Sequence, residues 1–412
     1  MIFTVGMTIW VLALVLLASL AGLGYRQGVI RVAFSLIGIF ISALLAGPLS
    51  GLFKPLLPHL GIHNPVAVWL LAPLVVFVIL LSLFKSAGFF VNRKVDVYYK
   101  YKTDELQQML WSRLNHRLGM CLGLVNGLVY LVLISFVIYD FSYWTAQWTV
   151  NGASPDGESR SVRMLNQMGR DLQSTGLAKV ARAVDPLPEI YFKAADLAGL
   201  LYQNPQLSDR LADYPPFISL DERDDFKQLG QDNDFQDAWK NHAPAGQLLN
   251  YASAKAIWQN NDTATLVWNT VTNNFDDLTN YLQTGLSVKY GSEKILGHWS
   301  INIGTTVAMV GQARPDIKPA EMAAVRALWT EAYAQTVFET GSDGQAFLKN
   351  LPDFKTHPPT PETWTGTWTA DDTNYDLTLS SNGENRSMTA QTDGVRLTIK
   401  DDRDTLIFDR ND

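Results

Sequence analysis

Four long apolar runs occupy the first third of the chain, and none of them contains a charged residue. They are residues 2–24, 32–53, 65–84 and 118–139. An α-helix needs about 20 apolar residues to cross the hydrocarbon core of a bilayer, and one central charge would cost about 2.5–3.5 kcal/mol on insertion. The pattern therefore predicts four transmembrane helices. The first run has no basic segment before it and exceeds the apolar core of a signal peptide, so we expect a retained helix.

Basic residues are distributed unevenly among the loops between these runs. The first loop carries Arg26 and Arg31, the third carries seven Lys/Arg over residues 85–117, and the second carries only Lys54. Cytoplasmic loops are enriched in Lys and Arg. We therefore expect loops one and three in the cytoplasm and both chain ends outside, with the soluble region in the periplasm of a Gram-negative cell.

Within the third loop, leucines recur every four residues from Leu106 to Leu118, and Thr103 can cap a helix that starts there. This spacing predicts an amphipathic helix lying on the membrane surface before the fourth span.

In the remaining two thirds of the chain, the periodicity of apolar residues changes once, from helical to strand-like. Residues 150–290 show a helical pattern, whereas residues 297–303 alternate as a half-buried strand should. A helix pair follows, with Pro315 between the helices and Pro319 opening the second. Eight strands are predicted at residues 297–303, 336–340, 345–349, 364–369, 375–380, 386–391, 395–400 and 405–409. Eight strands are enough to close a small barrel.

The predicted fold is therefore multi-domain. A four-helix transmembrane domain covers residues 1–140, a soluble α-helical region covers residues 150–290, and a small antiparallel β-barrel with a helix pair after strand one covers residues 291–412.

Charge separates the two halves of the chain. Residues 1–139 hold ten Lys/Arg and three Asp/Glu, and the rest holds 23 basic and 37 acidic residues. An acidic soluble region argues against nucleic acid as a partner, because phosphates need a basic surface.

Two glycine motifs lie in the membrane domain, one in the first interhelical loop and one in the fourth span. Gly119, Gly123 and Gly127 fall on one face of the fourth span, where small residues let another helix approach closely. That helix can belong to the same subunit or to a second one, and the sequence leaves both possibilities open.

The first interhelical loop, residues 24–31, reads GYRQGVIR. Gly24 and Gly28 allow a tight turn at the membrane interface, because glycine accepts positive φ. Arg26 and Arg31 are expected among the lipid phosphates.

Residues 24–31 and 117–127 resemble the colicin V production protein (CvpA) family of small four-span inner-membrane proteins. Its marks are G-[FY]-R-x-G-x-x-R in the first hairpin and R-x-x-G-x-x-x-G-x-x-x-G in the last span. Here Arg117 stands two residues before Gly119, and Val32 follows Arg31 where many members carry an acid. The resemblance implies a part in toxin production or export and in envelope maintenance.

The carboxy-terminal motifs GHW at residues 297–299 and GTW at residues 366–368 are similar to those of lipocalin and fatty-acid-binding barrels. This resemblance implies a barrel that can hold an apolar ligand. A barrel filled by its own side chains is the alternative.

No motif indicates catalysis, a metal or a cofactor. His59 and His63 are four apart without the Glu of a zincin, and residues 232–243 lack the glycine and closing Glu of a calcium loop. We expect a non-enzymatic membrane protein whose partners are the bilayer, envelope or secretion proteins, and a second copy through the glycine faces. A membrane-tethered binding module and an oligomeric pore are the alternatives.

Overall fold

The computed structural model describes residues 5–62, 65–150, 156–183, 185, 187–313, 318–356, 358–371, 374–401 and 405–411. His63 and Pro315 lie outside these residues. The chain forms two compact units, Met1–Gln203 with Asp237–Trp268, and Asn204–Gln236 with Asn269–Asp412. Each unit is described by itself, and the helices of residues 150–290 are divided between them.

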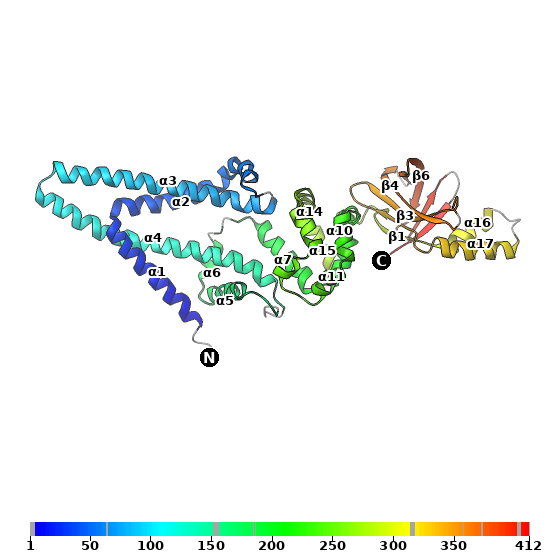
Figure 1. Cartoon of the computed structure of the whole chain (residues 1–412), viewed down its shortest axis with the longest axis horizontal. Coiled ribbons are helices and arrows are strands. Elements are labelled where there is room, and N and C mark those ends of the chain that lie inside the picture. Colours follow the sequence, from blue (N-terminus) through cyan, green and yellow to red (C-terminus); the bar gives the residue numbers. More distant parts are fainter. Residues whose placement is uncertain are drawn as a thin grey trace. The chain divides into compact units, whose positions relative to one another are not determined.

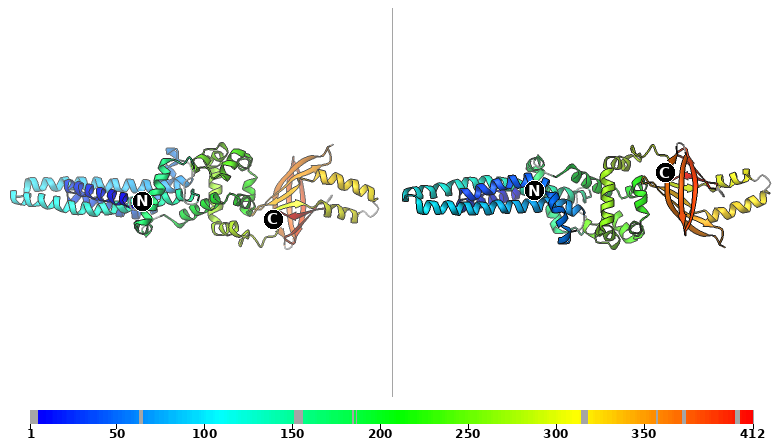
Figure 2. Two further views of the ribbon diagram at one scale, coloured as in Figure 1. Left: turned by 90° about the horizontal axis from the view of Figure 1, so that it is seen from below. Right: turned by 90° about the horizontal axis from the view of Figure 1, so that it is seen from above.

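Four long helices open the first unit: α1 (Val5–Gln27), α2 (Val29–Phe53), α3 (Pro65–Lys102) and α4 (Glu105–Gln147). All four are long and apolar enough to cross a membrane, which confirms the four predicted spans. In the bundle, α2 packs along α3 and α1 packs against α4 (Figures 1 and 2). Two short 3-10 turns, Lys54–Leu56 and Pro58–Leu60, lie in the loop after α2.

The predicted surface helix before the fourth span is wrong. Residues from Glu105 onward join the fourth apolar run in one uninterrupted helix of 43 residues. Thr103 does not cap this helix, because its Oγ1 donates to the carbonyl of Tyr99 in the last turn of α3. The ring of Tyr99 stacks on Trp111 at 4.6 Å and so fixes the connection between α3 and α4.

The carboxy-terminal part of α4 forms a core with the three helices that follow it. It packs against α5 (Arg160–Ser174), α6 (Leu177–Ala183) and α7 (Glu189–Gln203). Tyr139 of α4 is buried there with Leu172 and Ala181. The remaining helices before the barrel are α8 (Leu207–Ala212), α9 (Pro215–Asp221), α10 (Asp224–Gln231), α11 (Asn233–Lys240), α12 (Ala245–Leu248), α13 (Ala252–Gln259), α14 (Asn261–Asn273) and α15 (Phe275–Thr284).

Eight antiparallel strands form a closed barrel in sequence order, with β8 pairing back to β1. They are β1 (Gly297–Ile301), β2 (Val337–Thr340), β3 (Gln345–Asp353), β4 (Thr360–Asp371), β5 (Asn374–Ser381), β6 (Glu384–Thr392), β7 (Arg396–Lys400) and β8 (Thr405–Arg410). This confirms the eight predicted strands and the barrel. β3 and β4 run past their predicted ends, because their pairing continues beyond an irregularity between Leu348 and Leu351 that breaks the period of two.

Alternate side chains of the strands fill the barrel interior. Trp299, Phe338, Trp364 and Phe408 are among its largest fully buried side chains. The predicted helix pair, α16 (Ile303–Ala313) and α17 (Pro319–Ala332), connects β1 to β2. Pro319 opens α17 as predicted.

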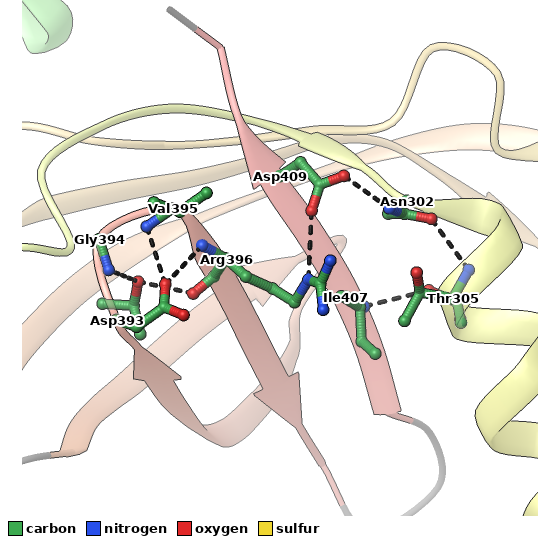
Figure 3. A network of polar contacts seen from close by, with 10 residues as sticks. Asn302, Thr305, Asp393, Gly394, Val395, Arg396, Ile407 and Asp409 are labelled. Carbon is green, nitrogen blue, oxygen red and sulfur yellow. Dashed lines mark hydrogen bonds and ion pairs between the residues drawn. The ribbon is translucent and has the colours of Figure 1, made fainter.

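A polar network fastens α16 to the closing strand (Figure 3). Asn302 accepts a hydrogen bond from the amide of Thr305 at 2.9 Å and donates to Asp409 of β8 at 2.5 Å. The amide of Ile407 donates to Thr306 Oγ1 at 3.1 Å. One asparagine thus caps α16 and ties it to β8.

The filled interior predicts a large loss of stability when a central ring is removed. Phe338→Ala is expected to lower the free energy of unfolding by about 3–5 kcal/mol, through lost burial and the cavity left behind. Urea unfolding of the purified protein measures this. Thr365→Ala, at an exposed position of β4, is the control and should change stability by no more than about 0.5 kcal/mol. Equal effects of both variants would contradict a packed interior.

Candidate functional site

The turn between α1 and α2 consists of a single residue, Gly28, with φ of 78°. Residues other than glycine rarely adopt this backbone conformation. In addition, a Cβ at this position would lie 2.5 Å from Asn115 Nδ2 of α4. Gly28 is therefore required both by the backbone and by the space that α4 leaves.

α4 supplies the hydrogen bonds that the two helix ends at this turn need. Asn115 Oδ1 accepts from the amide of Val29 at 2.8 Å, which satisfies a free donor at the start of α2. His116 Nδ1 lies 2.6 Å from the carbonyl oxygen of Tyr25, near the end of α1, and must be the donor because a carbonyl only accepts. Helix ends in or near lipid have little water to bond with, so these contacts hold the turn.

The glycine stripe of α4 packs against α1 of the same chain. A Cβ at Gly123 would lie 2.5 Å from the carbonyl oxygen of Leu20, and one at Gly127 would lie 3.0 Å from Leu17 Cδ2. Gly119 faces the backbone of Gly24 and Gly28. The structure thus brings the two glycine motifs of the sequence into one contact.

The two arginines of the hairpin have different surroundings. Arg26 is exposed, whereas Arg31 is half-buried and its guanidinium lies 4.7 Å from the ring centroid of Phe89 in α3. The contact with phosphates that was expected of both residues stays a prediction.

The helix contact predicts that a large side chain in the stripe will separate α1 from α4. In Gly123→Leu the new Cβ would lie 2.5 Å from the carbonyl oxygen of Leu20, so α1 and α4 would have to move apart. Overpacking of this kind costs about 1–3 kcal/mol or more. Thermal unfolding in detergent should show a lower midpoint for the variant. Gly22→Leu is the matched control, because a Cβ at Gly22 meets no atom within 4 Å. An unchanged midpoint for Gly123→Leu would refute this contact.

A network of charged side chains lies on the outer face of the barrel next to α9, with Glu339 buried and His298 and Lys349 half-buried. His298 of β1 and Glu339 of β2 are opposite each other in register, with His298 Nδ1 3.3 Å from Glu339 Oε1. Lys349 of β3 lies 2.7 Å from the other oxygen of Glu339 and also contacts Glu222, at the end of α9. Asp213 lies 3.5 Å from His298 Nε2. Among the described residues, no group of three or more His, Cys, Asp or Glu side chains has a geometry that could hold a metal.

Mutual attraction overrides burial in this ion network. Burial alone would lower the pKa of His298, but the hydrogen bond and charge of Glu339 raise it. Burial alone would raise the pKa of Glu339, but His298 and Lys349 lower it. The pKa of Lys349 is raised by Glu339 and Glu222 against the effect of burial. All three groups are therefore held in their charged forms.

The raised pKa of His298 predicts a pH-dependent stability. Its contribution is fully present below the unfolded-state pKa, about 6.5, and is lost as the pH rises through the higher folded-state pKa. Urea midpoints of the purified protein should therefore fall with rising pH across this window. His298→Gln should flatten that slope, and a slope unchanged in the variant would exclude His298 as its source.

A cavity of about 340 Å³ lies at one end of the barrel. Apolar side chains from four strands line it: Leu348, Met388, Ile399 and Leu406. Arg386 of β6 faces the same space and stacks over Trp364 of β4, with its guanidinium carbon 4.3 Å from the ring centroid.

Sequence reasoning missed the capping pair Asn115 and His116, the ion network and Arg386. The sequence signals for these residues were weak. Asn115 and His116 are polar residues within a basic loop, and the other residues are charged residues on strands. A charged residue at an alternate strand position is usually a solvated one, so the pattern did not distinguish His298 or Arg386 from surface residues.

Comparison with known proteins agrees with the membrane part of this structure. The family model of colicin V production protein matches residues 10–169, from α1 into α5. No curated protein and no solved structure matches the chain. Residues 10–169 are thus similar to the colicin V production protein family, the resemblance that the two glycine motifs indicated, and this region holds the four helices that are long and apolar enough to cross a membrane.

Proposed function

We propose that this chain is a non-enzymatic, multi-pass inner-membrane scaffold that acts in colicin V-type toxin production or export, or in envelope maintenance. The observation that carries the proposal is the family match over residues 10–169. It covers the four-helix bundle and continues into α5, which packs on α4. The matched region therefore includes the four long helices and most of α5, which packs on α4.

The distribution of basic residues supports an extracytoplasmic soluble region. Lys100 and Lys102 lie in the last turn of α3, at the end that connects to α4, and Arg113 and Arg117 lie in the first third of α4. With this end in the cytoplasm, the carboxy-terminal end of α4 emerges on the opposite side. The helical region and barrel then meet partners of the envelope or of the secretion apparatus.

A second candidate function is a membrane-tethered binding module. The cavity at the end of the barrel favours it, because the cavity combines apolar walls with an inward-facing arginine. The oligomeric pore loses its main support, because the glycine stripe that would join subunits is covered by α1 of the same chain.

The proposed topology predicts opposite labelling of two engineered cysteines in intact cells. In a Cys121→Ser background, which removes the chain's one cysteine, Thr367→Cys on the barrel should react with a membrane-impermeant maleimide. Tyr101→Cys, at a side chain that is 73% exposed, should react only after permeabilisation. The reverse pattern would place the soluble region in the cytoplasm and contradict the envelope role.

A further inference from the structure

Two acidic side chains meet inside the first unit, where α6 and α7 pack on α4. Asp140 lies on α4, one residue beyond the fourth apolar run, and Asp185 lies in the connection between α6 and α7. Asp140 is 4% exposed, and its carboxyl group lies within hydrogen-bonding reach of that of Asp185. None of the functions proposed above uses this pair.

The protein supplies too few hydrogen-bond donors for two ionised carboxylates at this place. Asp185 Oδ1 accepts from the amide of Leu187 at 2.8 Å. Asp140 Oδ1 and Asp185 Oδ2 are both closed to solvent, and neither has a hydrogen-bond partner among the residues that the structure describes. An ionised carboxylate can only accept, whereas a protonated one can donate. A proton on one carboxyl would therefore turn that group into a donor for the other.

The tyrosines near the pair do not supply this proton. Tyr139 of α4 and Tyr191 of α7 both interact electrostatically with the two acids. The hydroxyl of Tyr191 donates to the backbone carbonyl of Asp140 at 3.1 Å, and burial raises the pKa of Tyr191, so this hydroxyl stays neutral. Tyr143, one turn further along α4, donates to Asp196 of α7 at 2.6 Å.

Arg182, in the last turn of α6, is a cation that acts on the pair. Its side chain is exposed, and its charge favours the ionised form of Asp185. Burial has the opposite effect and is the larger cause, so the pKa of Asp185 is raised above its ordinary value. The surroundings thus favour a bound proton at a pH where an exposed aspartate is ionised.

We propose that Asp140 and Asp185 form a binding site for one proton, which the two carboxyls share and which joins α4 to the connection between α6 and α7. With the proton bound, the neutral carboxyl donates to its ionised partner. With the proton lost, two negative charges face each other away from water and repel each other strongly. The connection then separates from α4 until both carboxylates are hydrated. This inference goes beyond the functions proposed above and does not depend on them.

The sign of the pH effect follows from proton binding. In the unfolded chain an aspartate has a pKa of about 3.9. The stability that the pair contributes is fully present below this value and is lost as the pH rises through the higher folded-state pKa. Rising pH should therefore open the contact between α4 and the connection, and acid should close it.

The test measures hydrogen–deuterium exchange of the full chain in lipid nanodiscs from about pH 5 to about pH 9, a range that includes raised carboxyl pKa values. Protection factors of the amides of α6 and the first turn of α7 report the contact locally, because His298 also makes overall stability depend on pH. We expect them to fall at least about tenfold with rising pH, the change that one unit of pKa shift produces.

Asparagine variants keep the shape of the pair and remove the proton from it. In Asp140→Asn the amide N–H can donate to the Asp185 carboxylate at any pH, so the protection factors should no longer depend on pH. Asp185→Asn should have the same effect. Asp196→Asn is the matched control in the same core, because Asp196 accepts from Tyr143 and Gln147 instead, and it should keep the pH dependence of the wild-type chain.

An infrared titration of the wild-type chain gives a second measurement that needs no variant. The carbonyl stretching band of a neutral carboxyl should persist above the pH at which exposed aspartates ionise, and it should be lost together with the protection of α6. Asp140→Asn should lack this band.

Three results would overturn the proposal. The first is a pH dependence of protection that is the same in the wild-type chain and in both asparagine variants of the pair. The second is a carboxyl band that no variant of the pair removes. The third is a loss of protection at low pH on addition of a chelator, which would identify a bridging divalent cation in place of the proton.

Discussion

The sharp reversal of the chain at Gly28 is the constraint on which the membrane bundle depends. A one-residue connection leaves donors and acceptors at two helix ends unsatisfied, and lipid offers them no water. Asn115 and His116 of α4 provide those hydrogen bonds. The glycines of both helices then allow the backbones to approach closely enough for these short side chains to reach. The turn at Gly28, the two hydrogen bonds from α4 and the glycine contact between α1 and α4 therefore lie next to one another and hold the same helix ends.

The length of α4 has a consequence within its unit. Because the helix does not break between Glu105 and Gln147, one continuous helix carries both the hydrogen bonds at the hairpin and the core around Tyr139. The surface helix was a reasonable expectation from leucine spacing, yet no proline separates that segment from the fourth span, and Gly119 at the junction lies within the continuous helix. Helix propagation is favourable once nucleated, so the two segments form one helix.

The stability of the barrel depends on pairing every strand edge and on filling the interior. Closure of β8 on β1 removes exposed strand edges, and the large buried rings fill the middle and leave space at one end only. Outside, charged side chains of β1 to β3 contact one another, and Lys349 also contacts Glu222 at the end of α9. Inside, Arg386 faces the cavity. The alternation of side chains along the strands thus places an ion network on the outer face of the barrel and Arg386 at the cavity on the inner face.

The sequence by itself determined the four apolar helices, the eight strands and the similarity of residues 10–169 to the colicin V production protein family, because apolar run length, strand alternation and glycine spacing are local properties. It did not determine what the glycines touch, that Asn115 and His116 cap a turn more than 80 residues away, or that His298, Glu339 and Lys349 form an ion network. Those contacts depend on which segments meet in three dimensions. A polar residue has the same local pattern whether it faces water or a partner, so only the tertiary structure decided its role.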